Sequence, residues 1–320
     1  MSKLRYAGGD LDRASSRRSQ PDWVLEQLEH NTSLVVPVSG TRNLFALEPS
    51  EGTFSHALLP RVRELREHLD GDVEFVLLGL RETVAVFTLD LSTVEDEIIT
   101  RRFGGEFADL RIAGACLPGA DASLLAYARG LLHWHRTHRF CGGCGRQTTS
   151  VHGGHMRSCL ECAWEAFPRI DSAVIMLVET TNDAGEPICL LGRNARLPTG
   201  IFSTLAGFVE TGESLEETVV REVMEEAGVT VDTVNYRGSQ PWPFPASLML
   251  GFRAHATTTK ICRHDEELEE AYWFTASELS SFGEWSDDSA TLRLPRHDSI
   301  ARVLIDEWLA EHAGKDPTDC

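Results

Sequence analysis

The chain has 320 residues, of which 42% are hydrophobic, enough apolar material for two or three domains with buried cores. Its 30 basic and 49 acidic side chains give a net charge of −19, which argues against a protein that coats nucleic acid through its overall field. We find no apolar leader at the N-terminus and no run long enough to span a bilayer, so we expect a cytoplasmic protein with no membrane partner.

Residues 1–135 are expected to form an α+β domain. A short helix is predicted at residues 22–30, and the apolar, β-branched runs VVPV, VEFVLLGL and TVAVFTL predict strands. The stretch SLLAYARGLLHWHRTH carries apolar residues at helical spacing and predicts a closing helix. No catalytic constellation and no internal repeat is evident in this region, so the sequence leaves its role open.

A zinc ribbon is predicted next, in residues 136–168. Two CxxC pairs have the spacing of a closed tetrahedral site, with the ligands Cys141, Cys144, Cys159 and Cys162. Because the protein supplies all four ligands, no coordination position is left for a substrate, and the zinc is predicted to be structural. The alternative, two redox-active dithiols, lacks a thioredoxin-like context.

Residues 169–313 are predicted to form one α/β sandwich. The runs DSAVIMLVE, ICLLGR and LMLGFRAHA predict strands, and SIARVLIDEWLAEH predicts a closing helix. Strands that surround helices within about 150 residues are typical of such a fold. The whole chain is therefore expected to be a multidomain α+β protein.

The stretch GFVETGESLEETVVREVMEEAGV carries the chemistry of this last domain. Glu222, Glu225 and Glu226 stand at i, i+3 and i+4, which places them on one arc of a helix. Like charges this close repel unless a cation lies among them, and hard oxygen ligands suit Mg²⁺ or Mn²⁺. Arg221 can reach back to Glu213 and fix the preceding loop. The alternative is an exposed acidic helix face.

The spacing in this stretch is a glycine, five residues, a glutamate, seven residues, then Arg-Glu-aliphatic-x-Glu-Glu-x-Gly-aliphatic, which resembles the Nudix box without a mismatch. The resemblance implies an α/β/α sandwich that hydrolyses a nucleoside diphosphate linked to another group. It implies that Glu226, Glu222 and Glu225 are catalytic and hold Mg²⁺ or Mn²⁺, which neutralises the pyrophosphate and lowers the pKa of a bound water. Further metal ligands implied by the resemblance are the carbonyl of Ala206 and, from the acidic run HDEELEEA, Glu267.

A proline-rich segment, SQPWPFPASLM, follows the box. Its three prolines preset an extended backbone, so little conformational entropy is lost when a ligand binds. Trp242 and Phe244 either pack this segment onto the protein or meet a flat ring of the ligand, and Gln240 and Ser247 offer polar atoms to a ribose or carboxamide. The substrate-binding residues expected here are Gln240, Pro241, Trp242, Pro243, Phe244, Pro245, Ala246 and Ser247.

The proline-rich segment and the four-cysteine ribbon ahead of the box resemble the NADH pyrophosphatase subfamily of Nudix hydrolases. This resemblance covers residues from about 136 to 313 and implies hydrolysis of NAD(H) to AMP and nicotinamide mononucleotide. It implies that Phe208 stacks on the nicotinamide ring and that Phe167, supplied by the second subunit of a homodimer, closes the other face. It also implies that Ala301 belongs to the substrate site.

Removal of NAD caps from the 5′ ends of RNA by the same site is a second hypothesis, which a local excess of basic residues in the zinc ribbon favours. The sequence does not separate NADH, NAD⁺ and NAD-capped RNA as substrates. One alternative is a Nudix hydrolase of another nucleoside diphosphate derivative, such as ADP-ribose or a diadenosine polyphosphate. The other is a nucleic-acid-binding zinc-ribbon protein with an inactive Nudix fold, against which the intact box and the net charge argue.

Overall fold

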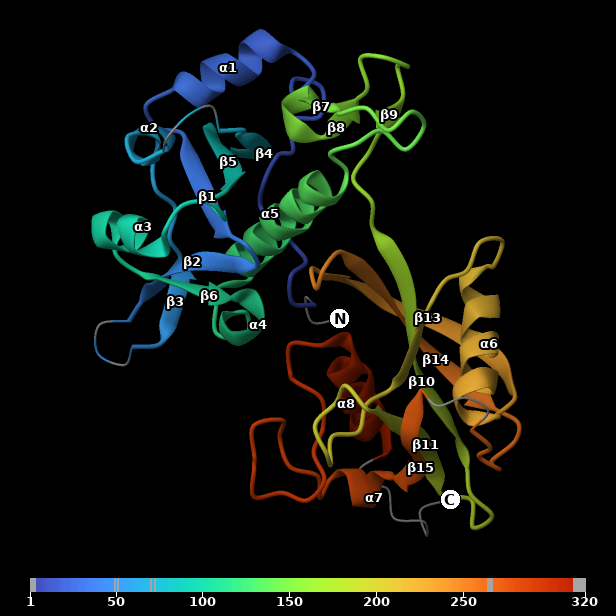
Figure 1. Ribbon diagram of the computed structural model, residues 1–320. Helices are drawn as coiled ribbons and strands as arrows, with labels where there is room; N and C mark the ends of the chain where they lie inside the picture. The colour runs from blue at the N-terminus through green and yellow to red at the C-terminus, as the bar shows by residue number, and fades with distance from the viewer. Residues whose placement is uncertain are drawn as a thin grey trace. The chain divides into compact units, whose positions relative to one another are not determined.

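Figure 1 shows the computed structural model of the chain, which describes residues 4–48, 50, 52–69, 71, 73–263 and 267–312. Within these ranges the predicted multidomain α+β fold is confirmed, since both helices and strands occur along the chain and the strands form separate sheets. No helix in the same ranges is both long enough and apolar enough to cross a lipid bilayer.

The chain divides into two compact units. The first unit comprises Met1–Ile170 together with a short segment from much later in the sequence, Pro241–Ala246. The second unit comprises Asp171–Gln240 and Ser247–Cys320. The predicted N-terminal domain and zinc ribbon thus fall in one unit, and the three-part division made from the sequence stays a prediction.

A mixed sheet forms the centre of the first unit. Its strands are β1 (Leu34–Ser39), β2 (Arg42–Leu47), β3 (Phe54–Ala57), β4 (Val76–Arg81), β5 (Val84–Asp90) and β6 (Glu106–Asp109). The helices of this unit are α1 (Pro21–Glu29), α2 (Val62–Arg66), α3 (Asp96–Phe103), α4 (Leu110–Ala113) and α5 (Gly119–Thr137). The strand order is β3-β2-β1-β5-β4, with β6 paired to β2 and β1 parallel to β5.

Both faces of this sheet are covered, which explains why its strands read as continuous apolar runs rather than as alternating ones. Successive side chains of a strand point to opposite faces. Val36 and Val38 of β1 accordingly pack in the core that includes α5, whereas Val35 packs in a second core with Phe87 and the α1 residue Trp23. Each face thus has its own helical layer (Figure 1).

The zinc ribbon continues from α5 as a small sheet of its own. Its elements are β7 (Thr149–Val151), a single 3-10 turn η1 (His152–Gly154), β8 (Met156–Ser158) and β9 (Glu165–Ala166). The strand order is β7-β8-β9, and all pairs are antiparallel. The elements are too short to enclose an apolar core, so their stability has to come from the metal site and from packing on the rest of the unit.

The second unit is built on another six-stranded sheet. Its strands are β10 (Asp171–Thr181), β11 (Pro187–Asn194), β12 (Leu205–Phe208), β13 (Val231–Trp242), β14 (Ser247–Ala256) and β15 (Leu268–Thr275). Its helices are α6 (Leu215–Ala227), α7 (Ala276–Leu279) and α8 (Ile300–His312). The order is β13-β14-β10-β11-β15, with β12 paired to β10 and β14 parallel to β10. Helix α6 packs in the core with β10, and α8 also contacts β10 and β14, as the predicted sandwich requires.

The two units repeat one topology, which the sequence did not reveal. Strand order β4-β5-β1-β2-β6 of the first unit corresponds to β13-β14-β10-β11-β15 of the second, including the parallel central pair. Along the chain, α2 takes the place of α6, and α5 takes the place of α8. The expectation of no internal repeat is therefore wrong at the level of the fold. Helix α2 has only 5 residues, whereas α6, the helix that carries Glu222, Glu225 and Glu226, has 13. Among its described residues the first unit therefore has no counterpart of this carboxylate helix.

Gln240 ties the end of β13 to the start of α8 within the second unit. Its side chain is 0% exposed; its amide nitrogen donates to the carbonyl of Asp298 at 2.7 Å, and its amide oxygen accepts from the backbone nitrogen of Ile300 at 2.8 Å. Both polar ends thus serve the backbone at the N-terminus of a helix, where donors have no partner inside the helix. The structure gives Gln240 a structural role, and its predicted contact with substrate has no support here.

We predict that Gln240→Leu lowers the free energy of unfolding by about 2–4 kcal/mol, because a buried donor and a buried acceptor lose their partners while the side-chain volume is kept. Urea denaturation followed by circular dichroism measures this change. The exposed Gln147 provides the control, since Gln147→Leu removes no described side-chain hydrogen bond. Equal stability of the two variants would contradict the role given to Gln240.

Candidate active site and zinc site

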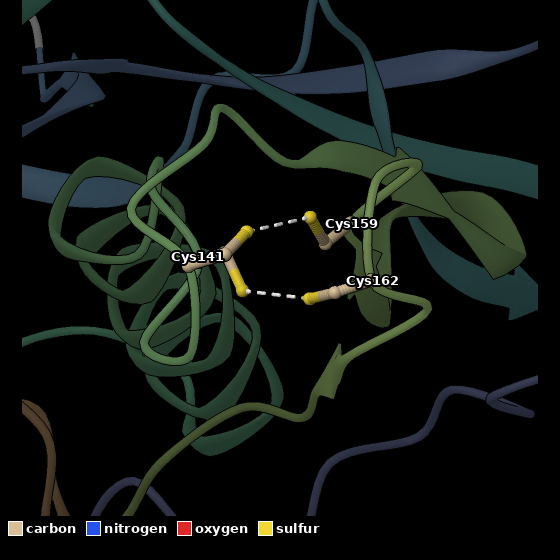
Figure 2. Close-up of side chains that lie close together, drawn as sticks. Cys141, Cys159 and Cys162 are labelled. Atoms are coloured by element: carbon tan, nitrogen blue, oxygen red, sulfur yellow. Dashed lines mark hydrogen bonds between the residues drawn. The ribbon is translucent and has the colours of Figure 1, made fainter.

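The four cysteines predicted to bind zinc lie together in the first unit. Their sulfur atoms all lie within 4.8 Å of one another, with 3.6 Å between Sγ of Cys141 and Cys162 and 3.5 Å between those of Cys144 and Cys159. In a regular tetrahedron with Zn–S bonds of about 2.3 Å, the sulfurs are about 3.8 Å apart. Figure 2 shows Cys159 and Cys162 pointing toward Cys141 from the opposite loop. The predicted cluster of four cysteines is confirmed, and its geometry suits zinc.

The turn that follows Cys141 favours the thiolate form of this residue. The backbone nitrogen of Gly143 lies 3.3 Å from Sγ of Cys141 and donates to it. Burial opposes ionisation of Cys141, but the backbone N–H groups of Cys144 and Gly143 lower the pKa of its thiol to about 7. Since the thiolate is the form that binds metal, this turn favours metal binding by Cys141 at neutral pH.

The nearby histidines take part in packing rather than in the metal site. His135 on α5 shares a hydrogen bond with the carbonyl of Gly154 at 2.7 Å, and His155 bonds the carbonyl of Leu77 at 2.7 Å. Burial lowers the pKa of His155 to about 4, so the ring is neutral at physiological pH and donates this bond. The two rings join the ribbon to α5 and β4.

Helix α6 has a capping motif at each end. Ser214 and Glu217 form a capping box, in which the Ser214 hydroxyl accepts from the nitrogen of Glu217 and the Glu217 carboxylate accepts from the nitrogen of Ser214. Gly228 ends the helix in the left-handed conformation, at φ 66°. The caps fix the rotation of the helix, so one face carries the carboxylates and the neighbouring face packs on the sheet.

The three predicted catalytic glutamates differ in their surroundings. Glu222 and Glu226 are buried, at 8% and 3% exposure, whereas the Glu225 side chain is 53% exposed. Nη1 of Arg221 lies 2.9 Å from Oε1 of Glu222 and 2.9 Å from Oε2 of Glu225. The exposed acidic face considered as an alternative is therefore wrong for two of the three carboxylates.

Gly207 of β12 is the surface against which Glu222 packs. A Cβ atom at this position would lie 1.8 Å from Cδ and from Oε1 of Glu222, a distance that no real contact allows. Only glycine therefore lets this carboxylate lie against the strand. Pairing of β12 with β10, in which Gly207 is opposite Val174 and Ala206 opposite Ile175, fixes the position of the strand.

Arg221 holds the loop ahead of the helix, as predicted. Its Nε donates to Oε1 of Glu213 at 2.6 Å, and its Nη2 donates to Oε2 of Glu213 at 3.0 Å and to the carbonyl of Phe208 at 2.9 Å. Glu213 also accepts from the nitrogen of Glu210 and the hydroxyl of Thr218. The hydrogen bond from Arg221 is the largest cause that lowers the pKa of Glu213 to about 2, so this carboxylate stays ionised.

The electrostatics of the site identify a fourth nearby acid. Burial raises the pKa of Glu222; the adjacent Arg221 opposes the rise, while the charges of Glu225 and Glu267 add to it. The charge of Glu267 thus acts on Glu222, and the role of Glu267 as a metal ligand stays a prediction. The neighbouring acidic run at residues 264–266 lies outside the described residues. Ala206, whose carbonyl is the other predicted ligand, is half-buried on β12.

These residues fit a divalent cation such as Mg²⁺ or Mn²⁺. The donor set consists of oxygen atoms, which such hard ions prefer. Because Gly207 has no side chain, there is room for the Glu222 carboxylate beside the strand. The charge of a cation would also offset the mutual repulsion of the carboxylates, which Arg221 now offsets.

The proline-rich segment packs on the core of the first unit. The ring of Tyr6, which is buried, lies edge-on to Trp242 with the centroids 6.1 Å apart and to Phe244 with the centroids 5.8 Å apart. Trp242 and Phe244 also meet each other at 5.1 Å. Of the two roles left open for these aromatics, the structure supports packing. Tyr6 was missed because its partners are separated from it by more than two hundred residues.

The remaining predicted substrate residues are placed as follows. Phe208 and Phe167 are exposed, at 60% and 62%, so both rings are accessible in the chain itself. Ser247 is half-buried at the first position of β14, and Ala301 is buried on α8. The substrate-binding roles of all four stay predictions.

Three family models match the chain in succession. They are described as an NADH pyrophosphatase-like rudimentary NUDIX domain at residues 32–134, an NADH pyrophosphatase zinc ribbon domain at residues 136–165 and a NUDIX domain at residues 170–294. The first description agrees with the repeated topology of the two units, and the resemblance inferred from the sequence is confirmed.

Curated proteins and solved structures also match. The NAD-capped RNA hydrolase NudC of Pseudomonas syringae is 44% identical over 60% of this chain and 63% of its own length, so this chain spans less than two thirds of that relative. The human NAD-capped RNA hydrolase NUDT12 is 32% identical over 93% of this chain and 72% of its own length. A NUDIX hydrolase structure from Nitrosomonas europaea aligns with 44% of this chain and 79% of its own at 24% identity and a TM-score of 0.38.

We predict that Cys159→Ser releases the zinc and lowers the melting temperature by at least about 5 °C, because a structural metal contributes folding energy directly. Elemental analysis and calorimetry measure the two effects. Cys116, an exposed cysteine outside the cluster, supplies the control, and Cys116→Ser should keep one zinc per chain. Full zinc content in Cys159→Ser would rule out this ligand set.

Proposed function

The chain belongs to the Nudix family, and from this premise we propose that it hydrolyses the pyrophosphate bond of NAD(H) to AMP and nicotinamide mononucleotide and removes NAD caps from RNA 5′ ends. The observation that carries the proposal is the carboxylate group on α6, with Glu222 packed on Gly207 and Arg221 between Glu222 and Glu225. The match to the NADH pyrophosphatase zinc ribbon and the similarity to NAD-capped RNA hydrolases support the choice of substrate.

The proposed metal site comprises Glu222, Glu225 and Glu226, joined by Glu267 and the carbonyl of Ala206. Bound Mg²⁺ or Mn²⁺ would neutralise the pyrophosphate and lower the pKa of a coordinated water. Burial of Glu222 and Glu226 limits their motion, so their oxygens are placed before the substrate arrives. Arg221 holds Glu213 and the carbonyl of Phe208, which keeps the loop beside these acids closed.

In the proposed reaction one water molecule adds across the P–O–P bridge. A bond forms between the water oxygen and one phosphorus, the bridging P–O bond breaks, and the electron pair stays on the departing phosphate. The proton lost by the water goes to a carboxylate of the site. Glu267 is exposed, and its charge contributes to the raised pKa of Glu222. Its carboxylate is therefore available to accept the proton from the water.

Recognition of NAD would depend on flat apolar surfaces. Phe208 directly follows Gly207, so a base stacked on its exposed ring would lie close in sequence and space to the carboxylate group. Aromatic stacking contributes about 0.5–1.5 kcal/mol beyond burial. We assign the second face to Phe167 of another copy of the chain, which makes the active form a homodimer. We place this enzyme in the cytoplasm, where its thiols stay reduced.

Product analysis tests the proposed function. The full chain, with Mg²⁺ or Mn²⁺ added, is incubated with NADH, NAD⁺, ADP-ribose, a diadenosine polyphosphate and NAD-capped RNA, and the products are separated by chromatography. We expect AMP and nicotinamide mononucleotide from NADH and a 5′-monophosphate end on the RNA. Cleavage of ADP-ribose without cleavage of NADH would keep the Nudix chemistry and overturn the substrate.

We predict that Glu226→Gln decreases kcat by at least about 10²-fold, because it removes one charge from the group proposed to hold the metal. The fold and the zinc content should stay unchanged, since the amide has nearly the volume of the acid. Glu216→Gln changes an exposed residue on the same helix and should retain full activity. Activity of Glu226→Gln within threefold of wild type would exclude Glu226 from the reaction.

We also predict that Gly207→Ala decreases kcat by about 10²-fold, because the added methyl displaces the Glu222 carboxylate by about an ångström or more. Gly130→Ala is the control, since a Cβ at that position on α5 meets nothing within 4 Å. Steady-state kinetics of both variants measure the difference. Equal activity would show that the position of Glu222 does not matter for catalysis.

A further inference from the structure

Arg129 on α5 is a buried cation that contacts the proline-rich segment. Its residue is 5% exposed, and its Nε donates to the carbonyl of Pro243 at 2.9 Å. Its guanidinium carbon also lies 4.9 Å from the centre of the Phe244 ring. On its other side, Nη1 donates to the carbonyl of Thr41 and lies 3.4 Å from the carboxylate of Asp109.

The segment needs such a donor because its own backbone offers few. Proline has no N–H group, so Pro241, Pro243 and Pro245 cannot donate to a strand ladder. The nitrogen of Phe244 is used inside the turn, where it donates to the carbonyl of Trp242 at 2.8 Å. The carbonyl of Pro243 therefore depends on a side chain for its partner, and Arg129 supplies it.

Aromatic and cation–π contacts also fix the proline-rich segment in place. Arg111, at the start of α4, places its guanidinium 4.7 Å from the centre of the Phe244 ring, so this ring meets two cations. Tyr6 closes the aromatic side through Trp242 and Phe244. Cation–π contacts that are shielded from water are worth more than exposed ones, and Arg129 is buried.

We propose that Arg129 is a positioning residue for substrate selection, which fixes the conformation of Pro241–Ala246 through the carbonyl of Pro243. This inference rests on the proposed function in one respect, namely that the proline-rich segment contributes to recognition of NAD. The role of Arg129 is indirect, since it acts through the shape of the segment.

The chain provides a matched control in Arg136. It lies two turns further along α5, donates to the carbonyl of Gly40 at 2.7 Å and pairs with Asp90 at 3.2 Å. Arg129 makes the corresponding contacts to Thr41 and Asp109. The two arginines thus both join α5 to the loop between β1 and β2. They differ in the contact with Pro243 and Phe244 and in burial, since the Arg129 side chain is 7% exposed and that of Arg136 is 31% exposed.

The experiment compares Arg129→Met with Arg136→Met in the full, zinc-loaded chain. Steady-state kinetics with NADH and with ADP-ribose give KM and kcat, and amide hydrogen exchange of the peptide spanning 239–249 reports the segment without any substrate. For Arg129→Met we expect KM for NADH to rise about tenfold, kcat and ADP-ribose cleavage to stay within about threefold, and exchange in 239–249 to increase. Arg136→Met should change none of these.

Other outcomes overturn the inference. Equal losses with NADH and ADP-ribose, or increased exchange throughout the first unit, would show that Arg129 only stabilises the fold. If wild type cleaves ADP-ribose but not NADH, the proposed substrate fails, and hydrogen exchange alone decides whether Arg129 fixes the segment. If Arg129→Met does not fold, Arg129→Lys keeps the charge but not the planar set of donors, and the same comparison is made with it.

Discussion

The position of Glu222 against Gly207 is the constraint on which the rest of the candidate site depends. A carboxylate can lie on the strand only because that position has no side chain, and burial there makes its charge costly. The adjacent acids increase this cost. Arg221 offsets part of it and at the same time binds Glu213, so the loop ahead of α6 and the acidic group form one electrostatic unit. The pairing of β12 with β10 supplies the rigid surface for this arrangement.

Because the two units share one topology, a comparison of them shows which features belong to the fold and which belong to the candidate site. Both units have the same order of strands and a closing helix, yet within the described residues only the second has a long helix with clustered carboxylates. Helix α2 is little more than one turn long, and Glu64 is its only acidic residue. The fold alone therefore does not create a catalytic site, because such a site also requires acidic residues on the helix. The first unit can have a different role in the chain.

Local signals in the sequence were sufficient to predict which side chains come together in the two sites. The CxxC pairs, the spacing of the acids on α6 and the link between Arg221 and Glu213 all depend on residues close together in the chain, and each appears in the structure. The repeated topology was not visible, because a pairing order is set by contacts between distant strands. The packing partners of Gln240 and Trp242 were not predicted for the same reason, because Asp298 and Tyr6 lie far from them in sequence.

The assignment of Pro241–Ala246 to the first unit has a consequence for how this protein could evolve or be dissected. A gene fragment that encodes only the second unit would still encode Trp242 and Phe244, now without Tyr6 and Arg129 to cover them. Exposed aromatic tips of this kind favour self-association. The two units are thus not independent modules. A protein that lost the first unit would also have to replace the segment Pro241–Ala246.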